Sequence, residues 1–553
     1  MKVLITTAGI GSRLGEMTSL MNKAMVKVGK KPVISYVIES YPEDTEFVVV
    51  IGYKGEHIKQ FLNLMYNDRH IDIVEVDNYC GPTSSPAYSQ LMAASLLQEP
   101  FIYHSCDTIV EDLQSKLSDV IANGELRCNF LMGYKTNSGL YDSFNYDERS
   151  SKKVISKLFS KGESDSSMLS YIGIAGIKDY KAYWEAMEDA YTNSLNNGSA
   201  PSDFYVYKNI LKDRGYKLEG VETDSWHDLG SISGVSNARK TFKDSFNVLD
   251  KTDQAVFIFD DKQQVVKFFA KDGVVGKLME RARTFNGCIP EIIKHTENFF
   301  IYKFVDGKDA PDVMTAPKFK KMINALVKDG LWKYDLAETT EMAKKDFHER
   351  QERFYIEKTL QRISKFKSNY SIEEGKALTI NDIDIPAEAT VEKMVKLLPK
   401  CKEWQDAIYR PWHGDFILDN MLIKEDGSPV LLDWRESFNG VTRFGDMLYD
   451  FAKMNHNLTV SHKVVFNDGY KVSEDDNGNI RTSILVSTDL IECKKILLDT
   501  VEEKYGIRRE FVEALTGVVW LNMSPLHGYP FDKFLFYHGK LTLYKAVKAL
   551  GLM

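Results

Sequence analysis

Short apolar runs alternate with longer stretches of mixed polarity in the first 240 residues. The runs predict strands over residues 3–5, 47–51, 71–76 and 101–103, and the stretches predict helices over residues 32–41 and 55–66. Because strands and helices alternate, we expect a mostly parallel sheet with helices on its faces. The runs are continuous in valine and isoleucine, which favours strands buried on both faces. This part of the chain is therefore predicted to be an α/β domain.

The pattern changes near residue 240. A closing helix and a polar bridge are followed by two short strands, a helix and a third strand, over residues 233–243, 246–250, 255–259, 264–270, 275–285 and 298–304. After Asp309 the pattern is mainly helical, apart from residues 421–433. We therefore predict two domains, over 1–243 and 250–553, the second with a small sheet lobe over 250–309 and a mainly helical lobe over 310–553.

Length and composition limit the class of protein. The chain has 553 residues, enough for three or four average domains or two large ones. Hydrophobic residues make up 43% and charged residues 27%, which excludes a disordered or collagen-like chain. The formal net charge is −8, with no basic block, so we expect small-molecule substrates rather than a nucleic-acid partner.

Cysteine usage and hydropathy indicate the compartment. The six cysteines are scattered and form no Cys-x-x-Cys pair, so neither a disulfide framework nor a zinc ribbon is predicted. The apolar run at residues 3–5 is too short for a signal peptide, and no run approaches the length of a membrane span. We expect a cytoplasmic protein that does not span a membrane, and the sequence leaves its oligomeric state open.

A glycine-rich turn, residues 7–14, follows the first predicted strand directly. Gly9 and Gly11 let backbone N–H groups approach a phosphate without an intervening Cβ, and Arg13 and Lys23 add cations. A tight turn between strand and helix would use the same glycines. A dinucleotide-binding fingerprint needs a third glycine at position 14, where the chain has leucine, which argues against an oxidoreductase.

The ordered segments 9–14, 22–25 and 29–32 resemble the signature of sugar-phosphate nucleotidyltransferases, including their phosphocholine cytidylyltransferase-like branch. The resemblance covers about residues 1–240 and extends to residues 51–53, to Asp107 and to residues 226–231. It implies a Rossmann-like, mostly parallel sheet. It also implies catalysis by Lys23 and Arg13, nucleotide binding by Ala8, Gly9, Gly11, Ser12, Arg13 and Lys23, and Mg²⁺ binding by Asp107 and Asp228.

These residue types suit the chemistry that the resemblance implies. Both substrates are anionic, so cations must offset their repulsion, and Mg²⁺ prefers carboxylate and phosphate oxygens. Asp107 could instead cap a strand end, and Asp228 could be a turn residue.

The chain departs from the family at Thr7, where alanine is usual, and at Asn22, where proline is usual. The variant at Asn22 occurs in the cytidylyltransferase-like branch and favours CTP, although the base is not readable from the polar loop at residues 78–85.

A second group of polar residues follows in the C-terminal half. His413-Gly414-Asp415 and Asn420 precede a predicted strand, and Asp433 ends the next one. Two adjacent strands would bring Asp415, Asn420 and Asp433 together. Phosphoryl transfer needs such a set, with one aspartate to accept the proton of the attacking hydroxyl and an asparagine and an aspartate to hold Mg²⁺.

His-Gly-Asp-x-x-x-x-Asn resembles the catalytic loop of the aminoglycoside phosphotransferase and choline kinase superfamily over about residues 250–553. The resemblance implies a bilobal, protein-kinase-like (α+β) domain. It makes Asp415 the base, Asn420 and Asp433 the metal ligands, and Lys267, with Glu280, the contact to the ATP phosphates. A glycine-rich loop is absent, and Arg435 stands where an acidic residue is frequent, which leaves the number of metal ions open.

The two resemblances together predict a bifunctional enzyme. The kinase would phosphorylate a small hydroxyl compound with ATP, and the nucleotidyltransferase would couple that phosphate to a nucleoside triphosphate, releasing pyrophosphate. The product would be an activated donor for bacterial surface (capsular) polysaccharide or lipid synthesis. A sugar or polyol ranks ahead of choline or ethanolamine as the acceptor. A non-catalytic nucleotide-binding scaffold is the other alternative, and the intact set of Arg13, Lys23, Lys267 and the metal ligands argues against it.

Overall fold

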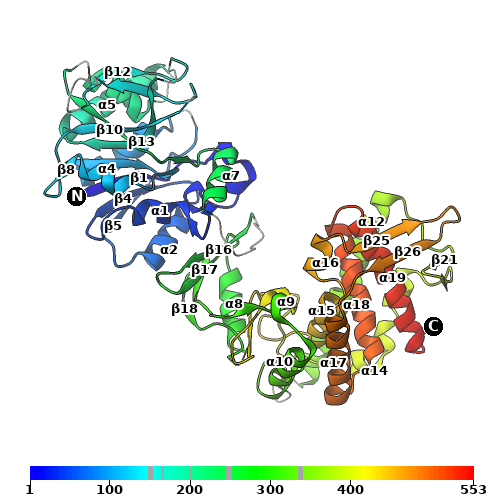
Figure 1. The fold of residues 1–553 in the computed structure, drawn as a ribbon. Helices are drawn as coiled ribbons and strands as arrows, with labels where there is room; N and C mark the ends of the chain where they lie inside the picture. The colour runs from blue at the N-terminus through cyan, green and yellow to red at the C-terminus, as the bar shows by residue number, and fades with distance from the viewer. Residues whose placement is uncertain are drawn as a thin grey trace. The chain divides into compact units, whose positions relative to one another are not determined.

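The computed structural model divides the chain into two compact units. The first comprises Met1–Asp272 and Ile292–Lys303, and the second comprises Gly273–Glu291 and Phe304–Met553 (Figure 1). The structure describes residues 1–81, 83–136, 138–146, 153–163, 167–197, 201–212, 214–242, 252–285, 287–333 and 340–553. The bridge predicted at 246–250 lies outside these residues. The domain ranges 1–243 and 250–553 therefore stay predictions.

A mixed sheet forms the framework of the first unit. In the described residues it has nine strands, with β10 and β14 attached beside the strand order β12-β11-β13-β6-β1-β4-β5. Its centre is parallel and comprises β1 (Lys2–Thr6), β4 (Glu46–Ile51), β5 (Ile71–Glu75) and β6 (Phe101–Ser105). These four strands confirm the predicted α/β arrangement.

An antiparallel extension completes the sheet beside β6. The strand β13 pairs antiparallel with β6, β10 and β11, and β10 pairs parallel with β14. The strands concerned are β10 (Asn129–Lys135), β11 (Ser143–Tyr146), β12 (Ile155–Phe159), β13 (Leu169–Ile177) and β14 (Leu218–Glu222). The sheet is therefore mixed, with a parallel core.

Helices cover both faces of the parallel core, as the continuous apolar runs predict. On β1, Val3 and Ile5 belong to the apolar cluster that includes α1 (Val33–Glu39) and α2 (Gly55–Met65). Leu4, between them, belongs to the cluster that includes α3 (Pro86–Met92) and α5 (Tyr180–Asn197). Alternate residues of the strand thus point into different apolar layers, which explains why no polar residue interrupts it.

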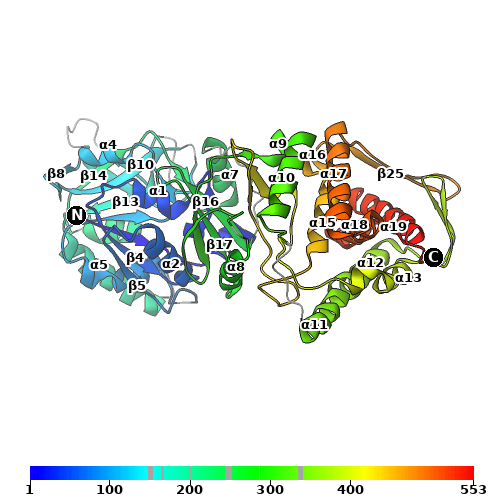
Figure 2. The same ribbon diagram turned by 90° about the horizontal axis from the view of Figure 1, so that it is seen from below.

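A small antiparallel sheet also belongs to the first unit. Its strand order is β16-β17-β19-β18, with β16 (Gln254–Phe259), β17 (Gln264–Phe269), β18 (Ile292–His295) and β19 (Phe299–Lys303). The sequence predicts these strands as the small lobe of the second domain. In the structure they pack against α2 of the first unit, and Figures 1 and 2 both show α2 beside β17.

Aromatic and amide contacts join the small sheet to α2. Phe61 of α2 is fully buried, and its ring centroid lies 6.0 Å from that of Phe257 and 5.9 Å from that of Phe299. Beside it, the Gln60 amide donates to Asn298 Oδ1 at 3.0 Å, and the Asn298 N–H donates back to Gln60 Oε1 at 3.1 Å. The small sheet and α2 thus share one apolar core.

The second unit is mainly helical, as predicted for residues 310–553. Its described helices of eight residues or more are α8 (Val274–Ala282), α10 (Ala316–Lys328), α11 (Glu341–Glu352), α12 (Lys358–Tyr370), α15 (Met447–Asn457), α17 (Thr488–Tyr505), α18 (Arg509–Met523) and α19 (Phe531–Ala549). Figure 1 shows α15, α18 and α19 side by side. The helices α18 and α19 approach closely, because a Cβ on Gly517 would lie 2.9 Å from the Gly539 carbonyl oxygen.

Two small sheets interrupt the helices of the second unit. One consists of β20 (Lys308–Asp309), β23 (Met421–Ile423) and β24 (Pro429–Leu431). The other consists of β21 (Leu378–Ile380), β22 (Ile383–Ile385), β25 (Tyr470–Glu474) and β26 (Ile480–Ile484). The antiparallel pair β23–β24 is the predicted strand pair that follows Asn420 and precedes Asp433. Among the described residues, no helix combines the length and apolar character that crossing a membrane requires.

We expect Phe61→Ala to destabilise the first unit by about 3–5 kcal/mol, the usual loss when a buried phenylalanine is truncated. The variant removes the ring that contacts both the small sheet and the rest of the core. The measurement is the free energy of unfolding in urea, with Phe466→Ala as control because Phe466 is 89% exposed. A loss below about 1 kcal/mol would contradict this packing, since exposed sites usually change stability by less than about 0.5 kcal/mol.

Candidate functional site

The loop after β1 approaches Lys23 closely. Gly11 has a φ of +70°, and a Cβ on it would lie 3.1 Å from Lys23 Cβ. Only glycine adopts this conformation freely, so Gly11 permits both the turn and the close approach. Ala8 is buried, whereas Gly9, Ser12 and Arg13 are exposed. The loop therefore presents Gly9, Ser12 and Arg13 to the outside.

Asn22 fixes the position of Lys23. Its Oδ1 accepts the Ala24 N–H at 2.9 Å and caps the short helix η2 (Lys23–Met25). Its Nδ2 donates to the Thr7 carbonyl at 2.9 Å and to the Tyr53 carbonyl at 2.6 Å. A proline at position 22 could make none of these bonds, so the departure from the usual family residue has a structural role in this chain.

An ion pair joins Lys23 to Asp107, which lies two residues after the end of β6. Lys23 Nζ lies 3.0 Å from Asp107 Oδ2, and Ser105 Oγ donates to Asp107 Oδ1. Burial alone would raise the pKa of Asp107, but Lys23 and the Ser105 hydrogen bond outweigh it and lower the pKa to about 2. Burial would lower the pKa of Lys23, and the charge of Asp107 outweighs it, so that pKa is raised. Both groups are therefore charged near neutral pH.

The second predicted acidic residue, Asp228, lies beside Asp107. The short strand β15 (His227–Asp228) pairs with β7 (Thr108–Ile109), and the Leu229 N–H donates to the Asp107 carbonyl at 2.8 Å. The Tyr141 hydroxyl donates to Asp228 Oδ2 at 2.8 Å, and the Gly230 N–H donates to Oδ1 at 2.9 Å. Backbone pairing thus brings together two aspartates that are far apart in the sequence.

Arg13 completes the group. A Cβ on Gly230 would lie 2.8 Å from Arg13 Nη2 and 3.1 Å from Asp228 Oδ1, so the absence of a side chain at 230 leaves room for the guanidinium. The charge of Arg13 also helps to lower the pKa of Asp107. The structure therefore brings Arg13, Lys23, Asp107 and Asp228 together at the end of the parallel strands β1 and β6.

Two carboxylates are a fitting partial ligand set for Mg²⁺. In the described part of the chain, no group of three or more histidine, cysteine or acidic residues is arranged to hold a metal ion. Mg²⁺ is usually held by one or two carboxylates, with water and substrate phosphates completing its octahedron. Asp107 and Asp228 fit this mode, because they are adjacent and the low pKa of Asp107 keeps it ionised.

In the second unit, the segment around His413 is held by buried polar groups. The N–H groups of His413 and Gly414 donate to Asp450 at 2.6 and 2.7 Å, and His413 Nε2 contacts the Leu432 carbonyl at 2.8 Å. The fully buried Arg281 of α8 donates to the carbonyls of Trp412 and Arg435. These contacts hold the two predicted loops, which precede β23 and follow β24, side by side.

Asp415 lies at the centre of this second site. Its Oδ1 lies 2.8 Å from Lys453 Nζ, and its Oδ2 accepts from Asn420 Nδ2 at 3.0 Å. The Leu432 N–H donates to the Asn420 carbonyl at 2.8 Å, which places Asp433 one residue beyond this backbone bond. Burial would raise the pKa of Asp415, but Lys453 outweighs it and holds the pKa well below its usual range. The structure thus groups two of the predicted residues directly and places Asp433 beside them.

The predicted partnership between Lys267 and Glu280 stays a prediction. Lys267 is a buried residue of β17 in the first unit, and its Nζ lies 5.9 Å from the centroid of the Tyr302 ring. Glu280 is an exposed residue of α8 in the second unit, and its carboxylate accepts a hydrogen bond from Thr442. The residue of α8 that contacts the His413 segment is Arg281.

The sequence did not identify three residues that contact the predicted aspartates, namely Ser105, Tyr141 and Lys453, nor Arg281, which binds the backbone next to the second site. Tyr141 and Lys453 are distant in sequence from the aspartates they contact, and neither lies in a motif. Ser105 stands two residues before Asp107, and this spacing was the one local signal that could have identified it. The others required the fold.

Comparison with known proteins supports a relation for the N-terminal region. No protein-family model matches the chain. The choline-phosphate cytidylyltransferase of Streptococcus pneumoniae is 24% identical over 249 residues, which cover 38% of this chain and 99% of that protein. The probable glucose-1-phosphate cytidylyltransferase of Bacillus subtilis is 35% identical over 72 residues, covering 13% of this chain and 28% of that protein.

A solved structure of CTP:phosphocholine cytidylyltransferase from Streptococcus pneumoniae aligns with 44% of this chain and 99% of its own, with 18% identity and a TM-score of 0.36. The sequence comparisons agree with the resemblance carried by the loop at residues 9–14. The N-terminal region of the chain thus matches sugar-phosphate nucleotidyltransferases such as CTP:phosphocholine cytidylyltransferase.

We expect Lys23→Met to raise the pKa of Asp107 from about 2 to above 3.8, its ordinary value, because burial then dominates. In the wild type, Asp107 contributes stability that is fully present above pH 3.8 and is lost as the pH falls towards 2. The measurement is a pH titration of the carboxyl carbon by NMR. Lys59→Met, which removes an exposed pair with Glu75, should leave the midpoint unchanged, and an unchanged midpoint in Lys23→Met would contradict the pairing.

Proposed function

We propose that the first unit is a nucleotidyltransferase. An oxygen of a phosphate monoester attacks the α-phosphorus of a nucleoside triphosphate, the bond from that phosphorus to the α,β-bridging oxygen breaks, and pyrophosphate leaves. The observation that carries this proposal is the Lys23–Asp107 pair, with Asp228 and Arg13 beside it at the glycine-rich loop. Two anionic substrates and a Mg²⁺ ion would need such cations and carboxylates close together.

Each residue has a distinct role in this proposal. The backbone N–H groups of Gly9, Gly11 and Ser12 bind the triphosphate, while Lys23 and Arg13 offset the charge that develops on it. Asp107 and Asp228 would hold Mg²⁺, which would act as a Lewis acid and draw charge from the phosphate oxygens. Tyr141 and Ser105 orient the two carboxylates by hydrogen bonds and act as positioning residues.

The names of the relatives support CTP as the nucleotide. Both the choline-phosphate and the probable glucose-1-phosphate enzymes are cytidylyltransferases. Their acceptors differ, and we rank a sugar or polyol phosphate ahead of phosphocholine or phosphoethanolamine for this chain. The motif at residues 226–231, which contributes Asp228, resembles the sugar-phosphate branch and supports this order.

We further propose that the second unit contributes a small-molecule kinase. The observation that favours it is the contact of Asn420 with Asp415, beside a strand pair that Asp433 follows by two residues. A hydroxyl oxygen of the acceptor attacks the γ-phosphorus of ATP, the bond from that phosphorus to the β,γ-bridging oxygen breaks, ADP leaves, and the hydroxyl proton passes to Asp415. Asn420 and Asp433 would hold Mg²⁺, which would supply charge neutralisation on the phosphates.

The two reactions would be consecutive in one cytoplasmic enzyme. The kinase product, a phosphate monoester, is the acceptor class that the nucleotidyltransferase needs. The final product would be a nucleoside-diphosphate-linked donor for surface glycan or lipid synthesis. A non-catalytic scaffold would instead bind nucleotides without turnover.

We expect Lys23→Ala to lower the rate of nucleotidyl transfer by about 10²–10³, the usual effect of removing one transition-state donor. Phosphorylation of the alcohol should be unchanged. The measurement is pyrophosphate release from CTP with a supplied phosphate monoester, and a rate equal to that of the wild type would contradict the assigned role.

We expect Asp415→Ala to lower phosphoryl transfer by about 10²–10⁴, the typical contribution of a general base, while nucleotidyl transfer continues. ADP formation and pyrophosphate release are measured on the same preparation. Loss of both activities would show that the sites are not separable. Lys365→Ala, an exposed residue of α12, is the control and should retain both.

A further inference from the structure

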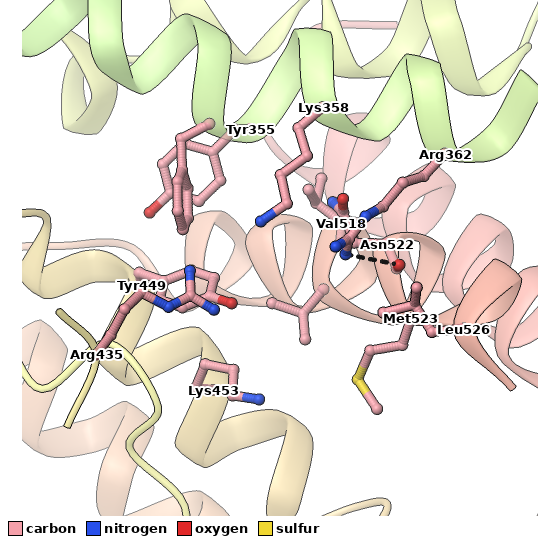
Figure 3. Close-up of a pocket in the computed structure, with 12 residues that line it drawn as sticks. Tyr355, Lys358, Arg362, Arg435, Tyr449, Lys453, Val518, Asn522, Met523 and Leu526 are labelled. Atoms are coloured by element: carbon pink, nitrogen blue, oxygen red, sulfur yellow. Dashed lines mark hydrogen bonds between the residues drawn. The ribbon is translucent and has the colours of Figure 1, made fainter. Parts of the chain in front are cut away.

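A cavity of about 170 Å³ lies in the second unit between α12, α15 and α18 (Figure 3). Its polar wall contains four cations, which are Lys358 and Arg362 of α12, Arg435 after β24, and Lys453 of α15. Lys358 and Arg362 are four residues apart and therefore share one face of their helix. Figure 3 shows the ends of Lys358 and Arg362 directed from α12 towards the space above α18.

Three of these cations contact aromatic rings or a carbonyl oxygen rather than a carboxylate. Lys358 lies over the Phe354 ring at 4.8 Å, and Arg435 lies over the rings of Phe354 and Tyr449 at 5.5 and 5.4 Å. Arg362 donates to the Asn522 carbonyl at 3.0 Å. Within the residues that the structure describes, none of these three forms an ion pair, and none of the residues that line the cavity is acidic.

The fourth cation connects the cavity to the candidate kinase site. Lys453 lines the cavity, and its Nζ lies 2.8 Å from Asp415 Oδ1. Asp415 offsets part of the charge of Lys453 and Arg435, and Glu436 offsets part of the charge of Arg435 and Lys358, so a net positive charge remains in a small, partly enclosed space. Burial, and next the charges of Arg435, Arg362 and Lys453, lower the pKa of Lys358 to about 8. An excess of positive charge of this kind favours the binding of an anion.

We propose that this cavity binds the acceptor of the phosphoryl group, and that the acceptor is an alcohol carrying its own negative charge, a carboxylate or a phosphate. The proposal rests on the kinase function proposed above and narrows its acceptor from a sugar or polyol in general to one that carries an anionic group. The anionic group would contact Lys358 and Arg362, which would direct the hydroxyl towards Lys453 and Asp415. Arg362 can bind either anion through two parallel hydrogen bonds.

Size and charge argue against other occupants. A cavity of about 150 Å³ holds a molecule the size of benzene, so this one accommodates a compact alcohol rather than a nucleotide. A choline or ethanolamine cation would be repelled by the cations of this wall. Aromatic rings that could hold a quaternary ammonium group do line the cavity, but Lys358 and Arg435 already lie over the rings of Phe354 and Tyr449. Val518 and Met523 give the cavity an apolar side that would contact the carbon skeleton of the ligand.

ATP is the phosphoryl donor in the proposed phosphorylation of the anionic alcohol. The hydroxyl oxygen of the anionic alcohol forms a bond to the γ-phosphorus, the bond to the β,γ-bridging oxygen breaks, and ADP carries away that oxygen with its electron pair. The proton of the hydroxyl passes to Asp415. The product carries two anionic groups, the original one and the new phosphate monoester.

The first test measures binding to the full chain by calorimetry. The probes are inorganic phosphate, D-glycerate, glycerol 3-phosphate, glycerol and choline, so that carboxylate, phosphate, neutral and cationic alcohols are compared. We expect the anionic probes to bind at least about tenfold more tightly than glycerol, the gain typical of one charge-assisted hydrogen bond. Tighter binding of glycerol or choline, or no binding of any anion, would overturn the proposal.

The second test uses Lys358→Met and Arg362→Met, with Lys365→Met as a matched control on the exposed side of α12. Each cavity variant should weaken anion binding at least about tenfold, and the control should not. Thermal unfolding distinguishes a loss of anion binding from misfolding of the variant. Removing one cation from this cluster should keep or raise the midpoint without anion. Added phosphate should stabilise the wild type and the control more than either cavity variant, because the loop at residues 9–13 is intact in all of them. Equal stabilisation of all variants by phosphate would overturn the proposal.

Turnover separates this proposal from the proposed kinase function. With ATP and the same alcohols, ADP formation should require an anionic alcohol, and Lys358→Met should raise the KM for that alcohol more than it lowers kcat.

If the anions bind in the cavity but no alcohol is phosphorylated, the kinase function fails and the acceptor assignment fails with it, while the anion site stands. If glycerol or choline is phosphorylated in preference to the anionic alcohols, the kinase function stands and the proposed acceptor class is wrong. If Lys358→Met and Arg362→Met weaken ATP binding as strongly as anion binding, the cavity binds the nucleotide and the proposal is also overturned.

Discussion

A lysine–aspartate ion pair lies at the centre of each candidate site, Lys23 with Asp107 in the first unit and Lys453 with Asp415 in the second. A carboxylate that is partly removed from water loses solvation free energy, and its attraction to an adjacent cation compensates for much of that loss. In both sites the pair keeps the aspartate ionised at neutral pH. An ionised aspartate can bind a metal ion or accept a proton, so both proposed chemistries depend on this interaction.

The topology of the first unit explains how its pair forms. The neighbouring parallel strands β1 and β6 end in register, with Thr6 opposite Ser105. The loop that leads to Lys23 and the residue Asp107 therefore leave the same edge of the sheet. In open α/β sheets ligands bind outside the carboxyl ends of the strands, which is where this group lies. The pairing of β15 with β7 then adds Asp228 to the same edge.

Local pattern predicted the parts of the structure that depend on neighbouring residues. The apolar runs located β1, β4, β5 and β6, and the His-Gly-Asp motif located the contact between Asp415 and Asn420. The packing of the small sheet on α2 could not be predicted, because it depends on buried rings, such as Phe61 and Phe257, that are far apart in the sequence. The cationic cavity was missed for the same reason, since α12, α15 and α18 contribute single cations or apolar residues that form no motif. Chemistry carried by one loop was therefore predictable, whereas chemistry assembled from several helices was not.

The central claim is that one chain adds a phosphate to an alcohol and then links that same phosphate to a nucleotide. Isotope tracing tests it most directly. The full chain is incubated with CTP, with ATP labelled at the γ-phosphorus, and with an alcohol that it phosphorylates. The account predicts that the label appears in the nucleotide-linked product, in the phosphate next to the alcohol, while the released pyrophosphate is unlabelled. A label that stays in ATP, in free phosphate or in the phosphate monoester, with no labelled nucleotide-linked product, would contradict it.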